Sequence, residues 1–142
     1  MQLSRNGILF IEKNEGFRPT VYNDNGKKAI GYGHDLLPGE SFPNGITHPE
    51  AEELALKDAK YAEKVCQTLF ERHPELTQNQ FDALVDFGFN LGVENLEKLL
   101  SHGLKEVPVQ MLKWCYEEVN GVQVKNPNLE ARRLQEVNLW NS

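Results

Sequence analysis

Residues 21–30 read VYNDNGKKAI, and this stretch marks the point where the chain changes from helix to sheet. Asn25-Gly26 stands between two short β-prone segments. It is the strongest short-range signal for a β-hairpin, because both residues tolerate the positive φ angles of a type I′ turn. We therefore predict an antiparallel hairpin that turns at these two residues.

The register of this hairpin follows by counting outward from the turn. The predicted pairs are Asp24 with Lys27, Asn23 with Lys28, Tyr22 with Ala29, and Val21 with Ile30. Side chains alternate between the two faces of a strand, and paired residues share a face. Tyr22, Asp24 and Ala29 are therefore expected on one face.

Upstream of the hairpin, residues 3–15 have the spacing of an amphipathic helix. Its inward stripe consists of Leu3, Gly7, Ile8 and Ile11, which recur three or four residues apart. Gly16 supplies the stop. Glu15 continues the stripe, so its carboxyl group is expected to be partly buried.

Downstream, residues 35–47 are rich in Pro and Gly and are expected to be irregular. Capping boxes at Thr47 and Thr77 predict a long helix to about His73 and a second helix that fades at about Gly92. Further helices are predicted over 95–101, 108–119 and 128–140. The elements predict an α+β fold, with an N-terminal helix and a small antiparallel β lobe packed on a mostly helical lobe.

We expect a single domain, residues 1–142, with lobes 1–46 and 47–142 that the long helix bridges. The formal net charge of −6 disfavours nucleic-acid binding and membrane insertion. The start of the chain has no long apolar run, so we expect synthesis in a cytoplasm without a signal peptide. We expect no metal, because the histidines and cysteines lack metal-ligand spacing. We also expect a monomer without a cofactor.

Glu15 and Asp24 are the best candidates for catalysis. Glycoside hydrolysis uses one protonated carboxyl group that donates to the leaving oxygen and one carboxylate that activates water or stabilises positive charge. Glu15 ends an apolar stripe and is expected to have a raised pKa, whereas Asp24 lies beside a turn and two lysines. The same residue types also serve solvation and turn formation, so the pattern alone leaves that structural alternative open.

Three motifs, in the same order, resemble signatures of the phage-type lysozymes, or endolysins, which are muramidases of glycoside hydrolase family 24. The first comprises Glu15-Gly16-Phe17-Arg18, Tyr22-Asn23-Asp24 and Ile30-Gly31-Tyr32-Gly33-His34. The second is residues 77–84 with Phe87, Phe89-Asn90 and Gly92, and the third is Leu112-Lys113-Trp114, Asn120-Gly121 and Arg132-Arg133 with Glu136. The resemblance spans nearly the whole chain.

This resemblance implies a lysozyme-like fold with a cleft between the lobes. It also implies cleavage between N-acetylmuramic acid and N-acetylglucosamine of peptidoglycan, with inversion. Glu15 would be the general acid, and Asp24 would hold and help to deprotonate the attacking water. The supporting residues would be Phe89 and Asn90 beside the saccharide cleft, His34 as a structural hydrogen-bonding residue of the β lobe, and Arg132 as a partner of Glu15.

The chain departs from the family pattern at Ala29, where a threonine usually helps to position the water. Its hairpin is also one residue shorter. We expect Ala29→Thr to fit the strand and to raise turnover by about threefold to thirtyfold, because the hydroxyl group adds one hydrogen bond to the water.

Three hypotheses follow from these features. The first is an active endolysin that reaches the wall through a membrane lesion made by another protein. The second is a lysozyme-fold protein that has lost catalysis and serves as a saccharide-binding or structural module, which Ala29 favours. The third is a secreted muramidase effector that acts on competing bacteria.

Overall fold

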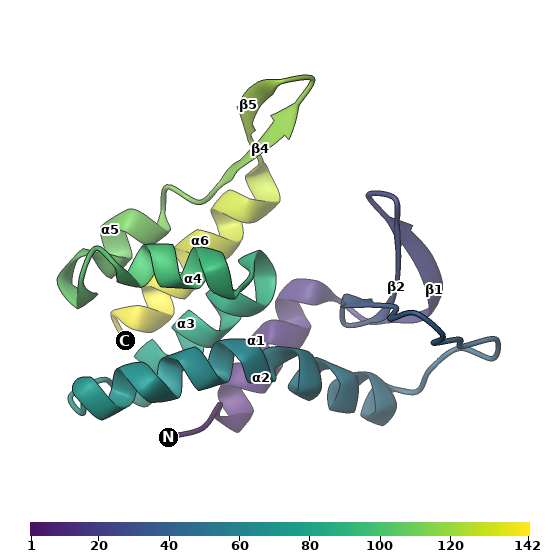
Figure 1. Ribbon diagram of the computed structural model, residues 1–142, viewed down its shortest axis with the longest axis horizontal. Coiled ribbons are helices and arrows are strands. Elements are labelled where there is room, and N and C mark those ends of the chain that lie inside the picture. Colours follow the sequence, from purple (N-terminus) through teal and green to yellow (C-terminus); the bar gives the residue numbers. More distant parts are fainter.

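The computed structural model describes residues 1–142, and Figure 1 shows helices with two projecting β-hairpins. The elements in chain order are α1 (Arg5–Glu15), β1 (Arg18–Asp24), β2 (Lys27–Gly31), β3 (His34–Asp35), α2 (His48–Arg72), α3 (Gln78–Leu91), α4 (Val93–Leu100), the 3-10 helix η1 (Leu104–Glu106), α5 (Val107–Met111), β4 (Tyr116–Val119), β5 (Val122–Lys125) and α6 (Pro127–Trp140). The predicted α+β fold is confirmed. None of the helices combines the length and apolarity needed to cross a membrane.

The main helices begin at side-chain caps that the sequence carries. Ser4 caps α1. Thr47 forms the predicted capping box with Glu50 at the start of α2, and Thr77 forms the second with Gln80 at the start of α3. These contacts satisfy amide groups that a helix leaves unpaired in its first turn, so both predicted starts are confirmed.

The first hairpin turns at the predicted residues, and the three pairs nearest the turn are confirmed. The fourth predicted pair, Val21 with Ile30, is wrong. The register shifts in the first half of β1, so that Arg18 lies opposite Gly31. Pro19 lies in the shifted segment, where its missing amide hydrogen prevents a regular ladder.

The predicted helix over 108–119 is wrong beyond Met111. Residues 116–125 form the hairpin β4–β5 instead, around an Asn120-Gly121 turn. Both turn residues have positive φ angles, 51° and 78°, which an Asn-Gly pair accommodates. The helical lobe therefore carries a second small sheet, and Val119, the last residue of the predicted helix, is 43% exposed.

Two hydrophobic clusters form the core. The larger cluster lies among the helices and includes Ile11 of α1, whereas the smaller one lies between the sheet and α2 and includes Ile30. One side of α2 serves both clusters, with Ala51 and Ala55 in the smaller and Ala59, Ala62 and Cys66 in the larger. Phe89 of α3 packs against both. The expected bridging role of the long helix is confirmed.

A pair of carboxyl groups links α1 to the start of α2. The Glu12 side chain is only 8% exposed, and its Oε1 atom has no donor within reach. Burial and the adjacent Glu52 raise the pKa of Glu12 to about 7, against the opposing charge of Arg5. The other ionisable groups here are His48, whose Nε2 lies 3.9 Å from Glu12, and Tyr32. The hydrogen bond between the two carboxyl groups favours the protonated form of Glu12, so that the pair shares one proton.

Glu12→Gln is expected to make stability less dependent on pH. The pKa of Glu12 in the folded protein lies above its ordinary value of 4.5, so folding favours the protonated form. Its stabilising contribution is complete below about pH 4.5 and is lost as the pH rises through 7. The check is urea unfolding at pH 5 and pH 8, where the variant should lose less free energy of unfolding than the wild type. Equal losses would contradict the shared proton.

Candidate active site

Glu15 is the last residue of α1, where Gly16 ends the helix with a positive φ angle of 74°. Its side chain is 18% exposed, and Oε2 accepts a 2.6 Å hydrogen bond from Nη1 of Arg132. A Cβ atom at position 33 would lie 2.8 Å from Oε1 of Glu15. The second glycine of the Gly-Tyr-Gly segment therefore allows the β lobe to approach the carboxyl group closely.

The electrostatics of Glu15 suit a proton donor. Burial raises the pKa of Glu15, the charge and hydrogen bond of Arg132 oppose this, and the nearby charges of Asp86 and Asp24 add to the rise. The carboxyl group of Glu15 is thus both buried and bonded to a cation. Its hydrophobic surroundings favour the protonated form before the reaction, and the guanidinium group is in place to stabilise the carboxylate afterwards.

Asp24 is the last residue of β1, opposite Lys27. Its side chain is exposed and makes no hydrogen bond or ion pair within the chain. Its charge contributes to the raised pKa of Glu15, so the two carboxyl groups interact electrostatically. An unpaired carboxylate at this place is available to hold a water molecule.

Ala29 pairs with Tyr22, as predicted, but it has no exposed surface. A threonine at this position would therefore not simply place its hydroxyl group toward the water, as the sequence led us to expect. The additional atoms of a threonine would enter the buried interior at this position.

Ala29→Thr is accordingly expected to lower the free energy of unfolding by about 1–3 kcal/mol, the usual cost of adding atoms to a packed site. Turnover should not rise. Thermal unfolding and the initial rate of product release check both parts. An unchanged melting temperature together with a faster rate would restore the original expectation.

Behind Glu15, Arg132 belongs to a buried network that the sequence analysis did not predict. Arg132 binds both oxygens of Asp86 at 2.7 and 3.0 Å, and Asp86 is completely buried. Burial works against ionisation of Asp86, but Arg132 and a hydrogen bond from Glu136 lower its pKa overall. Burial and Asp86 raise the pKa of Glu136 well above its ordinary value. Glu136 and Asp86 thus share a hydrogen bond in which burial favours the proton on Glu136.

A signal for this network is present in the sequence. Asp82 and Asp86 lie four residues apart in an otherwise apolar stretch, residues 81–89, and hence on one face of a helix. Charged side chains inside an apolar run are rarely buried without partners. Asp82 accepts from the Ser4 hydroxyl and amide groups, and Asp86 accepts from Arg132.

His34 occupies a structural position in the β lobe. Its side chain is 6% exposed, Nδ1 lies 2.8 Å from Asp58, and Nε2 lies 2.8 Å from Glu40. Burial lowers the pKa of His34, but the two carboxylate hydrogen bonds raise it overall. The side chain thus ties β3 to α2 and to the loop before it, away from Glu15.

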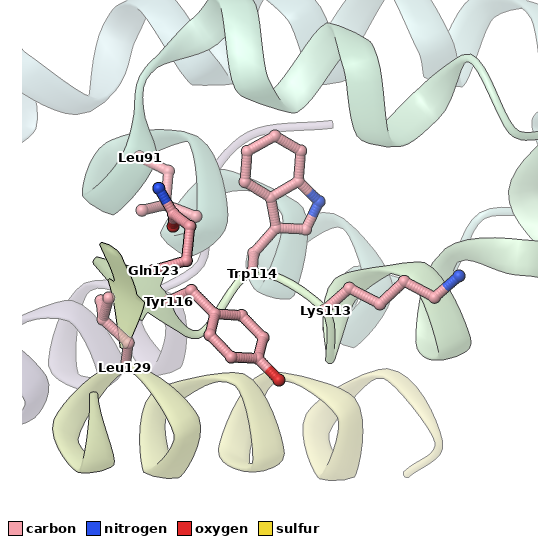
Figure 2. A pocket seen from close by; sticks show the side chains of 6 residues that line it. All are labelled: Leu91, Lys113, Trp114, Tyr116, Gln123 and Leu129. Atoms are coloured by element: carbon pink, nitrogen blue, oxygen red, sulfur yellow. The ribbon is translucent and has the colours of Figure 1, made fainter. Parts of the chain in front are cut away.

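Phe89 and Asn90 lie near the end of α3. Phe89 packs against both hydrophobic clusters, and Oδ1 of Asn90 accepts a 2.7 Å hydrogen bond from Nη2 of Arg133. The next residue of α3, Leu91, lines a pocket of about 410 Å³ together with Lys113, Trp114, Tyr116, Gln123 and Leu129. Figure 2 shows the Trp114 and Tyr116 rings in this pocket, which the β4–β5 hairpin helps to form.

Comparisons with known proteins agree with this arrangement. A family model described as phage lysozyme matches residues 12–136. An endolysin of Acyrthosiphon pisum secondary endosymbiont phage 1 is 30% identical over 149 residues, which cover 100% of this chain and 99% of that protein.

Solved structures show the same relationship. The muramidase domain of SpmX from Asticaccaulis excentricus is 30% identical and superposes with a TM-score of 0.81, covering 99% of this chain and 98% of that domain. An endolysin from the Escherichia coli phage FAHEc1 is 28% identical with a TM-score of 0.79, covering 99% of this chain and 93% of that chain. The similarity therefore extends over both lobes.

Proposed function

Because the chain belongs to the phage lysozyme family and is a lysozyme-type glycoside hydrolase, we propose that it cleaves the bond between N-acetylmuramic acid and N-acetylglucosamine in bacterial peptidoglycan. Glu15 is the general acid, and Asp24 holds and activates the water that attacks the anomeric carbon. We expect inversion at that carbon, with the water on the opposite face of the sugar from Glu15.

The observation that carries this proposal is the environment of Glu15. A largely buried carboxyl group with a raised pKa keeps a donatable proton to higher pH than an exposed carboxyl group does. Arg132 then stabilises the carboxylate left on Glu15, while Asp86 holds Arg132 in place through two hydrogen bonds. Asp24, exposed and unpaired, is free to accept the proton of the water.

Analysis of the soluble products by mass spectrometry tests the bond that is cut. Purified peptidoglycan treated with the protein should yield muropeptides with N-acetylmuramic acid at the reducing end. Products that end in N-acetylglucosamine would assign a different bond.

A second candidate function, saccharide binding without catalysis, is favoured by Ala29 at the position of the family's threonine. Binding to peptidoglycan without release of any product would support that second function.

The place of action follows from the substrate. We propose that the protein reaches the wall after its release from the bacterial cytoplasm, and that it acts there as a monomer on glycan strands. Sedimentation of the purified protein tests the monomeric state.

A further inference from the structure

Arg133 is a buried charge that follows Arg132, the partner of Glu15, in the chain. Its side chain is fully buried, donates to both oxygens of Glu136 at 2.5 and 3.1 Å, and lies 5.0 Å from the centre of the Phe87 ring. A buried guanidinium group costs desolvation free energy that apolar side chains of the same volume do not. Stability alone therefore does not account for a guanidinium group at this position.

The remaining contacts of Arg133 lead to the proposed saccharide cleft. Nη2 donates to Oδ1 of Asn90 at 2.7 Å, and Nη1 lies 3.5 Å from the carbonyl oxygen of Trp114. A guanidinium group has donors only. The amide group of Asn90 must therefore turn its oxygen toward Arg133 and its Nδ2 atom away from it.

The outward Nδ2 atom of Asn90 is free to bind a ligand. It donates to no group in the chain, and the one buried side-chain polar atom without a partner is Oε1 of Glu12. Nδ2 of Asn90 is therefore in contact with solvent. Asn90 also follows Asp86 by one turn of α3, so it extends the polar row that runs from Glu15 through Arg132.

We propose that Arg133 is a positioning residue that orients the Asn90 amide so that Nδ2 donates a hydrogen bond to an acetamido carbonyl oxygen of the bound glycan. This proposal rests on the proposed function, because N-acetylated sugars are the substrate of that function. An amide oxygen is a stronger neutral acceptor than the hydroxyl or ring oxygens of a sugar. A rigidly held donor next to the catalytic acid is suited to select the amide oxygen over the hydroxyl and ring oxygens.

The first test uses binding alone, in the Glu15→Gln background, so that no turnover occurs. Asn90→Asp keeps an acceptor for Arg133 but removes the Nδ2 donor. Calorimetry should show about tenfold weaker binding to soluble N-acetylated glycan strands, and a change below about twofold for the same strands after de-N-acetylation. Asn138→Asp, an exposed residue of α6 with the same change in charge, should alter neither affinity.

Equal weakening on both strands, or no weakening on the acetylated strands, would overturn the proposal. These outcomes are distinct from a failure of the proposed function. In that failure, protein with Glu15 intact binds the strands but releases no product.

A second variant separates positioning from folding. Arg133→Met combined with Glu136→Gln removes the guanidinium charge and the acidic group, keeps an apolar contact with the Phe87 ring, and leaves an amide donor for Asp86. We expect the preference for acetylated over de-N-acetylated strands to fall by about fivefold. This change should appear in KM and not in kcat. The pH profile of turnover should be unchanged, because Glu15 sets it. A lower melting temperature with an unchanged preference would show that Arg133 is merely structural.

Discussion

Glu15→Gln is expected to lower the rate of glycosidic cleavage by roughly two to four orders of magnitude, the usual contribution of a general acid. Glutamine keeps the size of the side chain and an oxygen that can accept from Arg132. It has no proton to donate to the leaving sugar. The fold should persist, because Asp86 continues to pair with Arg132 through two hydrogen bonds.

The pH dependence of the rate gives an independent check on Glu15. Its raised pKa means that the wild-type rate falls as the pH rises through that value, because the ionised carboxylate cannot donate. The residual activity of the variant should lack this alkaline decline. Release of muropeptides measured across the pH range tests both parts, with circular dichroism as the control for folding. A variant with near-normal rates would remove Glu15 from the mechanism.

Asp24→Asn is expected to reduce the rate by about one to three orders of magnitude, because the amide can orient a water molecule but cannot accept its proton. Asp24 is exposed and has no partner within the chain, so the melting temperature should hardly change. The neutral residue also removes a charge that raises the pKa of Glu15, and the alkaline limb of the profile should shift to lower pH.

The control for Asp24 is Glu118→Gln, which removes the same charge from an exposed strand of the β4–β5 hairpin. Initial rates of reducing-sugar release compare the two variants at equal protein concentration. If Asp24→Asn kept more than about a tenth of the wild-type rate, less than about 1.4 kcal/mol of transition-state stabilisation would depend on this carboxylate. The scheme with two carboxyl groups would then need a different base.

The elements that local sequence determines were predictable. Asn25-Gly26 located the first turn, because only the turn residues themselves have to adopt positive φ angles. The same dipeptide was present at Asn120-Gly121, but the helical spacing of apolar residues favoured a helix up to residue 119, directly before it. Pro19 was likewise a signal for the irregular half of β1, because proline has no amide hydrogen for a ladder.

The candidate site was predictable only in part. Glu15 and Asp24 stood out because each lies within a few residues of the feature that determines its environment. The network of Asp86, Arg132, Arg133 and Glu136 depends on contacts between α3 and α6, such as those that join residues 46 and 43 positions apart in the chain. Such contacts depend on how the helices pack, and helical spacing within one segment does not determine that packing.

The contact between Glu15 and Arg132 also has a consequence for protein synthesis, because it joins residues 117 positions apart. Helix α1 leaves the ribosome first, but its Ile11 packs in a cluster built mainly by helices that are translated later. The guanidinium group that holds the acid is translated as part of α6. A nascent chain therefore cannot form the ion pair between Glu15 and Arg132 until residue 132 has emerged from the ribosome.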